Sequence, residues 1–161
     1  MRLVLTPADA ELGRVEGERR HERTQGSKGR VVLSDDMTNA DVVGARGEIA
    51  VARAMRGEFH FDLRSGDPGW DVDTPDGMRH QVQTKLRTSS NAPLVRFTKH
   101  LDCDFLHFLR EVDDQAFEHM GFISYDEWTR HRRVAEHTPV PSWVIDQAWL
   151  TPLEAYWEEK R

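Results

Sequence analysis

Cysteine and long apolar runs are almost absent from this 161-residue chain. The single Cys103 has no partner for an internal disulfide and cannot form a thiolate zinc site alone. No apolar run approaches the roughly 18 residues of a membrane span, and the N-terminus lacks the apolar core of a signal peptide. Neither GxxxxGK[S/T] nor GxGxxG occurs, which excludes functions built on those loops. We therefore expect a cytoplasmic protein without a membrane partner.

The composition predicts one globular domain. Hydrophobic residues make up 38% of the chain, which is of typical single-domain length and has no low-complexity tract. Alternating helix-type and strand-type patterns predict an α/β (α+β) fold, with a central mixed β-sheet flanked by helices.

Acidic residues outnumber basic ones by 28 to 22, for a net charge of −6, which at first sight opposes a nucleic-acid partner. The excess lies in residues 101–161, which contain thirteen acidic and six basic residues. By contrast, residues 77–101 contain no Asp or Glu. This stretch holds five basic residues: Arg79, Lys85, Arg87, Arg96 and Lys99. Nucleic-acid binding is thus compatible with the acidic total, and we expect it to be weak, salt-sensitive and enhanced by metal.

Residues 1–36 are expected to form a weakly ordered, partly extended arm, with residues 37–161 as the domain proper. Four glycines interrupt this charged segment, namely Gly13, Gly17, Gly26 and Gly29. A helix is predicted over residues 39–55, which Gly57 ends.

Strand patterns dominate the next part of the chain. Residues 58–64 alternate, and residues 70–74 and 78–88 form a predicted hairpin around the turn Pro75-Asp76-Gly77. Residues 94–101 fit either a helix or a strand. The remaining predicted elements are strands over 104–112 and 117–124, a helix over 125–133, a strand over 143–150 and a helix over 151–160.

Four residues bear the chemistry that a divalent cation requires: Glu48, Asp71, Gln83 and Lys85. Strand alternation places Gln83 and Lys85 on one face, and the hairpin brings Asp71 close to residues 81–83. Carboxylate and amide oxygens are the ligands that Mg²⁺ prefers. An ammonium group beside such an ion can stabilise negative charge or orient a water.

These residues fall in three segments: Gly44-Ala45-Arg46-Gly47-Glu48, Gly69-Trp70-Asp71-Val72-Asp73, and Gln81-Val82-Gln83-Thr84-Lys85-Leu86-Arg87. In this order, they resemble the PD-(D/E)xK nuclease superfamily, which has the restriction-endonuclease-like fold, over roughly residues 39–125. Gln83 stands where most members have Asp or Glu, as in the glutamine variants among Mrr-like restriction enzymes.

The resemblance implies a metal-dependent nuclease that hydrolyses DNA, or RNA, phosphodiesters through a metal-activated water. Asp71 would be the main ligand of Mg²⁺ or Mn²⁺, Gln83 a second ligand, and Glu48 a ligand directly or through water. Lys85 would stabilise the transition state or position the water. Asp73 lies on the same strand face as Asp71 and could assist it.

Polar and basic residues near these segments are predicted to bind nucleic acid. They are Arg79, Arg87, Ser89, Ser90, Asn91, Arg96 and Lys99. A homodimer is one candidate assembly, since cutting both strands of a duplex usually takes two sites.

Two alternatives stay open. The first is a catalytically inactive nuclease-fold protein that binds nucleic acid or another protein, as Gln83 and the acidic C-terminal third suggest. The second is an unrelated acidic structural or inhibitor protein, in which Glu48 is a solvated helix residue and Asp71 lies far from Lys85.

Aromatic residues and histidines have simpler interpretations. We expect Trp128, Trp143, Trp149 and Trp157 to pack in the core, and Trp70 to lie at the rim of a cleft. The residues His100, Cys103, His107 and His119 match no metal-ligand spacing and are interpreted as packed residues, without a Cys nucleophile.

Overall fold

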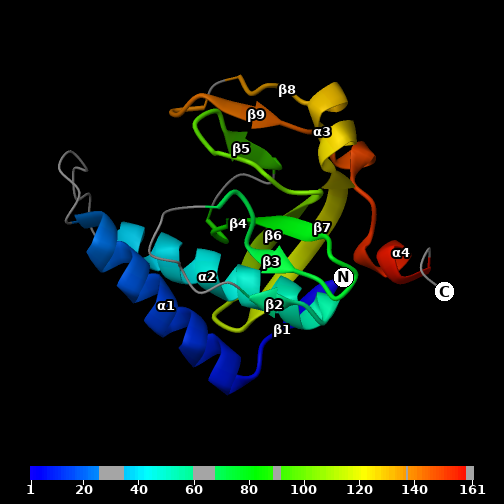
Figure 1. Cartoon of the computed structure of the whole chain (residues 1–161). Helices are drawn as coiled ribbons and strands as arrows, with labels where there is room; N and C mark the ends of the chain where they lie inside the picture. Colours follow the sequence, from blue (N-terminus) through cyan, green and yellow to red (C-terminus); the bar gives the residue numbers. More distant parts are fainter. Residues whose placement is uncertain (26–34, 60–67, 89–91, 137, 159–161) are drawn as a thin grey trace.

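The main sheet contains six strands in the order β1-β7-β6-β4-β3-β2 (Figure 1). They are β1 Arg2–Val4, β2 Glu58–Phe59, β3 Val72–Asp73, β4 Arg79–Lys85, β6 Phe105–Asp113 and β7 Ala116–Ser124. Strands β4 and β6 pair in parallel and the other neighbours are antiparallel, so the sheet is mixed, as predicted. The computed structural model describes residues 1–25, 35–59, 68–88, 92–136 and 138–158.

A smaller antiparallel sheet, in the order β5-β9-β8, lies beside one face of the main sheet (Figure 1). Its strands are β5 Leu94–Arg96, β8 Arg133–Val134 and β9 Ser142–Val144. The helices are α1 Pro7–Gln25, α2 Asp35–Met55, α3 Tyr125–His131 and α4 Leu153–Glu158, with a 3₁₀ turn at Gln147–Trp149. The predicted single α+β domain is confirmed. None of the described helices is long and apolar enough to cross a membrane.

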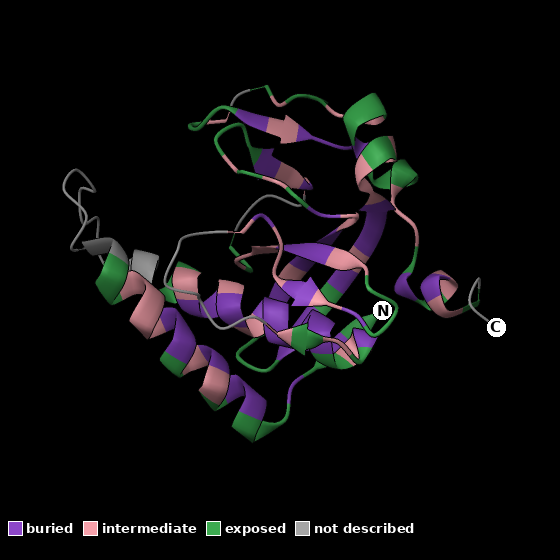
Figure 2. Ribbon diagram, in the orientation of Figure 1, coloured by how far each residue is buried: buried purple, intermediate pink, exposed green. Residues whose placement is uncertain are grey.

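Buried residues form one hydrophobic core on each face of the main sheet (Figure 2). Strand β4 contributes Val82 to the core that lies against α2. On one face Val82 and Leu109 pack against Ile49 of α2 and Tyr156 of α4. The core on the opposite face, around Leu106 and Phe108 of β6, includes Trp128 of α3 and Val95 of β5. Gln83 and Lys85 of β4 alternate with Val82 and Thr84, which face α2, so their side chains lie on the face towards the small sheet.

The N-terminal segment is not the extended arm that the sequence predicts. It forms β1 and the 19-residue helix α1, which packs along α2. A Cβ at Gly13 would lie 2.5 Å from Arg46 Cγ, and a Cβ at Gly17 would lie 2.3 Å from Val42 Cα. These glycines permit close packing of two helices instead of breaking one. Gly26 and Gly29 lie outside the described residues.

Most of the other predicted elements are confirmed with shifted ends. The hairpin at residues 75–77 and the β6–β7 hairpin are present, and the ambiguous residues 94–101 begin with β5. The last predicted strand was too long: it ends at Val144, because Asp146 caps a 3₁₀ turn. Of the strand predicted over 58–64, Glu58–Phe59 is present and residues 60–67 lie outside the described residues.

Three buried histidines form a hydrogen-bonded chain across the main sheet. Thr74 Oγ1 donates to Asp76 and therefore accepts from His80 Nε2, at 3.2 Å. His80 Nδ1 then accepts from His107 Nε2 at 2.9 Å, and His107 Nδ1 from His119 Nε2 at 3.0 Å. Burial lowers the pKa of His80 and of His119 to about 4, and it also lowers the pKa of His107 well below its ordinary value. The chain is thus neutral at pH 7.

This chain makes stability depend on pH. The folded pKa values lie below the unfolded value of about 6.5, so stability is full above that pH and declines as pH falls towards 4. Each histidine contributes a slope of about 1.4 kcal/mol per pH unit in this window. In urea denaturation between pH 7.5 and 5, we expect His119→Gln to reduce the slope by about that amount. The exposed His100→Gln should leave the slope unchanged, and an equal slope in His119→Gln would contradict the assignment.

The close packing of α1 on α2 is tested by Gly17→Ala. We expect a loss of about 1–3 kcal/mol in the free energy of unfolding, because the added methyl overlaps the α2 backbone. Gly44→Ala is the matched control on α2, since no atom lies within 4 Å of its added Cβ. It should be neutral or stabilise the protein by up to about 1 kcal/mol. Equal denaturant midpoints for the two variants would show that the helices do not pack as described.

Candidate functional site

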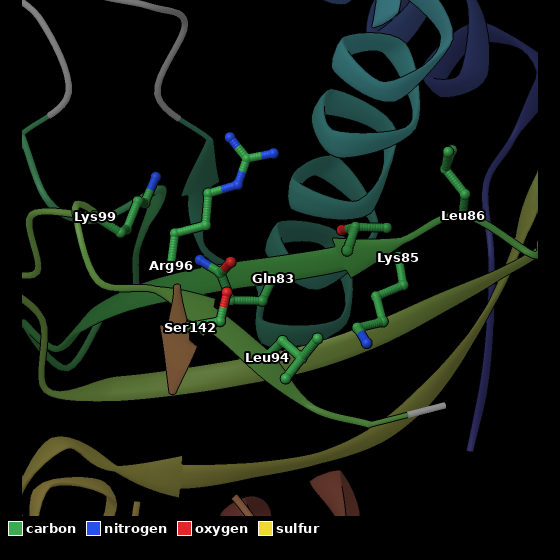
Figure 3. A pocket seen from close by; sticks show the side chains of 8 residues that line it. Gln83, Lys85, Leu86, Leu94, Arg96, Lys99 and Ser142 are labelled. Carbon is green, nitrogen blue, oxygen red and sulfur yellow. The ribbon is translucent and has the colours of Figure 1, made fainter. Parts of the chain in front are cut away.

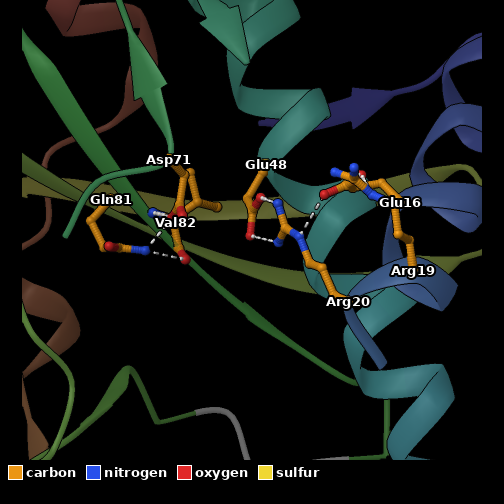
Figure 4. Close-up of polar contacts among 7 residues, drawn as sticks. All are labelled: Glu16, Arg19, Arg20, Glu48, Asp71, Gln81 and Val82. Atoms are coloured by element: carbon orange, nitrogen blue, oxygen red, sulfur yellow. Dashed lines mark hydrogen bonds and ion pairs between the residues drawn. The ribbon is translucent and has the colours of Figure 1, made fainter. Parts of the chain in front are cut away.

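Asp71 lies where β3 separates from β4. Its backbone N–H donates to His80 O at 2.8 Å, and its carboxylate Oδ2 accepts the Val82 N–H at 2.7 Å (Figure 4). The same oxygen accepts a hydrogen bond from Gln81 Nε2. The hairpin register thus brings Asp71 to Gln81 and Val82, within the predicted range of residues 81–83. Gln81, rather than Gln83, is its direct side-chain partner.

Glu48 is a buried helix residue, not the solvated one of the simpler interpretation. The preceding Gly47 lets α2 approach β4 closely, since a Cβ there would lie 2.0 Å from Thr84 Oγ1. Both carboxylate oxygens of Glu48 accept from Arg20 of α1, at 2.8 and 2.7 Å (Figure 4). Arg20 also donates to Glu16 at 3.1 Å. Sequence reasoning missed Arg20, because it assigned residues 1–36 to an arm.

The charges of Glu48 and Asp71 act on each other. Burial raises the pKa of Asp71 well above its ordinary value, and the negative charge of Glu48 raises it further. Lys99, the Val82 N–H and Arg20 oppose this rise in part. For Arg20, burial disfavours the charge, but Glu48 and Glu16 more than compensate and its pKa is raised. A cation beside Asp71 would stabilise its ionised form.

Gln83 and Lys85 line a cavity of about 430 Å³ between β4 and the small sheet (Figure 3). The other lining residues are Thr84, Leu86, Leu94, Arg96, Lys99 and Ser142. Along β4, Gln83 lies about 7 Å and Lys85 about 13 Å beyond the position opposite Asp71. Burial lowers the pKa of Lys85. Because Lys99 lines the cavity and also acts electrostatically on Asp71, the carboxylates and the cavity belong to one region.

The oxygen atoms of this region suit a hard cation. Besides the two carboxylates, Gln81 Oε1 is buried without a hydrogen-bond partner. The sequence motif Gln-x-Lys points to Gln83, so Gln81 was not predicted as a ligand. The hairpin register does place Gln81 opposite Asp71. Within the described ranges, no group of three or more His, Cys, Asp and Glu side chains has a metal-binding arrangement. A site here would therefore combine two carboxylates with an amide oxygen, and Arg20 would have to release Glu48.

The predicted nucleic-acid residues have different surroundings. Arg96 and Lys99 line the cavity, whereas Arg79 pairs with Asp102 at 2.6 Å and lies over the Trp70 ring. Arg87 is exposed near the end of β4. Ser89, Ser90 and Asn91 lie outside the described residues.

Cys103 is not suited to act as a nucleophile. Its thiol is buried, and burial together with the charge of Asp71 raises its pKa to about 12. Of the tryptophans expected in the core, Trp128 is buried and Trp143 half-buried, but Trp149 is 49% exposed and stacks on His131.

The carboxylate pair predicts a trade-off between stability and metal binding. Above the ordinary Asp pKa of 3.8, the ionised Asp71 is disfavoured in the fold. We therefore expect Asp71→Asn to raise the free energy of unfolding at pH 7 in chelator, because the neutral amide does not carry the cost of a buried charge. Mg²⁺ or Mn²⁺ should raise the melting temperature of the wild type but not of Asp71→Asn. The exposed Asp114→Asn is the control, and a wild type that neither ion stabilises would contradict this prediction.

No family model and no curated protein matches this chain. The resemblance to the PD-(D/E)xK superfamily therefore depends on the three segments and on the geometry of Glu48, Asp71, Gln83 and Lys85.

Proposed function

We propose that this protein is a metal-dependent nuclease that hydrolyses phosphodiester bonds in DNA. The observation that carries the proposal is the pair of interacting carboxylates, Glu48 and Asp71, beside a cavity lined by Gln83 and Lys85. Such a pair is unfavourable for folding alone, since burial and the charge of Glu48 both disfavour the ionised form of Asp71. The two carboxylates suit a bound cation, and the basic cavity beside Asp71 suits a phosphate.

Each residue has a role in this proposal. Asp71, Glu48 and Gln81 Oε1 would hold Mg²⁺ or Mn²⁺, with the predicted ligand Gln83 nearer the phosphate. The ion, when bound, supplies Lewis-acid polarisation of the phosphate and an activated water. Gln83 can orient a phosphate oxygen or a water through its amide. Lys85 can donate a proton or a hydrogen bond from Nζ to the oxygen on which negative charge develops.

The substrate would lie along the basic side of the cavity. Arg96 and Lys99 line it together with Lys85, and phosphate oxygens prefer such donors. DNA is the main expected substrate and RNA the second. We place the protein in the cytoplasm, and a homodimer would supply two sites for cutting a duplex.

A catalytically inactive nucleic-acid-binding protein is the second candidate. The observation in its favour is the bidentate ion pair from Arg20 to Glu48, which occupies both oxygens of a proposed ligand. Gln83 further reduces the negative charge available to a cation. In that case the basic cavity would bind nucleic acid without cleaving it.

Cleavage of plasmid and single-stranded DNA tests the proposal. With Mg²⁺ or Mn²⁺ present, we expect wild type to cut and Asp71→Ala and Lys85→Ala to lose at least 100-fold in rate, on the order expected for removing an electrostatic catalytic group. The exposed Asp114→Ala should cut like wild type.

Equal cleavage by wild type, Asp71→Ala and Lys85→Ala would refute the assignment and indicate another site or a contaminating enzyme. No cleavage, no heat of Mn²⁺ or Mg²⁺ binding by calorimetry, and DNA binding unchanged by chelator would instead favour the inactive binding protein.

A further inference from the structure

The small sheet has two unlike faces. On one face, Val95 of β5 and Trp143 of β9 pair with each other and belong to the hydrophobic core under α3. Strand alternation turns Leu94, Arg96 and Ser142 to the opposite face. These three residues line the cavity beside β4 (Figure 3). We call this second face of the small sheet its cavity-side face.

The cavity-side face extends beyond the cavity to Arg133 of strand β8. Strand β9 pairs Val144 with Leu94 of β5 on one side and with Arg133 on the other. Residues that lie opposite each other on neighbouring strands point to the same face. Arg133 therefore shares a face with Arg96. None of the strands β5, β8 and β9 contains Asp or Glu.

Positive charge is not balanced on this face. The cavity is lined by the cations Lys85, Arg96 and Lys99 and by no acidic side chain. Arg133 is exposed, and among the described residues neither Arg133 nor Arg96 forms an ion pair. A surface that carries charge of one sign attracts ligands of the other sign. The partner of this face is therefore an anion.

The spacing of the two arginines indicates an extended anion. Neighbouring strands lie about 4.8 Å apart and rise about 3.3 Å per residue, so two strands and two residues separate the Cα atoms of Arg96 and Arg133 by about 12 Å. Side chains stand roughly perpendicular to a sheet, so the two guanidinium groups extend side by side instead of converging. A single phosphate suits one of them, whereas a chain of phosphates suits both.

We infer that the cavity-side face of the small sheet binds the phosphate backbone of nucleic acid through Arg96 and Arg133. The backbone would run from Arg133 over Arg96 into the cavity beside Lys85. This path rests on the proposed nuclease function, whereas the binding surface can be tested without cleavage. A protein partner would need apolar anchors, but Leu94 is half-buried and Val144 is buried on this face.

DNA binding in chelator tests the surface separately from cleavage. Fluorescence anisotropy with a labelled 20-base-pair duplex and with its single strand, between about 50 and 200 mM salt, would compare wild type, Arg133→Gln and Arg133→Lys. Each phosphate contact adds about 0.7–0.9 to the steepness with which log affinity falls against log salt concentration. For the form of DNA that wild type binds more tightly, we expect Arg133→Gln to lose that amount of slope. Its affinity at about 0.1 M salt should fall about five- to eightfold. Arg133→Lys keeps the charge and should keep the wild-type slope.

The matched control is Arg130→Gln, which changes the net charge equally but lies on α3, where Arg130 pairs with Glu127 at 2.7 Å. It should keep the slope and affinity of wild type, and circular dichroism melting checks that each variant is folded. Equal losses in Arg130→Gln and Arg133→Gln would show an effect of net charge alone and refute the surface. A wild-type slope in Arg133→Gln would also refute it, even if Mg²⁺-dependent cleavage is found. A reduced slope in Arg133→Gln, without cleavage by wild type, would support the surface and refute the nuclease.

A labelled heptaglutamate peptide identifies the class of polyanion. At the same salt concentrations we expect wild type to bind this peptide more weakly than DNA. Binding of the peptide as tight as that of DNA would overturn nucleic acid as the partner and indicate an acidic protein segment.

Discussion

The structure of the candidate site depends on one backbone constraint, namely that β3 pairs with β4 over only two residues. Beyond Val72 and His80 the strands separate, and the next inward N–H of β4, that of Val82, needs another acceptor. The Asp71 carboxylate is that acceptor, at 2.7 Å. A side chain thus takes the place of a main-chain carbonyl. This substitution brings a charge into the gap between the strands, directly beside Gln81.

Placing Asp71 there has an electrostatic cost that the rest of the fold partly offsets. Helix α2 approaches β4 through Gly47 and brings in the second carboxylate, Glu48. Helix α1 then approaches α2 through Gly13 and Gly17 and supplies the counter-ion, Arg20. The close approaches at Gly13 and Gly17 thus bring α1 to α2, and the one at Gly47 brings α2 to β4 of the hairpin. Because Arg20 satisfies Glu48 and not Asp71, the negative charge of Asp71 stays disfavoured.

Sequence patterns predicted the elements around the site better than its contacts. Alternation and the turn at residues 75–77 predict the hairpin, because both signals are local. Whether a glycine breaks a helix or lets another helix approach depends on the partner, so Gly13 and Gly17 were misinterpreted. The register that selects Gln81 over Gln83 depends on how the turn is built. The contacts of Trp143 with Phe97 and with Arg132 join distant segments of the chain, which no local pattern indicates.

The net charge of −6 is a poor guide to what the cavity attracts, because the acidic excess lies in residues 101–161 and part of it is paired within the fold. Asp113 pairs with Arg2, Glu118 with Arg110, and Glu127 with Arg130. Arg96 at the cavity, by contrast, forms no ion pair with another described residue. It lies within residues 77–101, which contain no Asp or Glu. Since salt at physiological concentration screens charges beyond about 8 Å, a phosphate in the cavity responds mainly to these near cations. A locally basic surface on an acidic chain also limits non-specific contacts, because the distant acidic faces repel nucleic acid elsewhere.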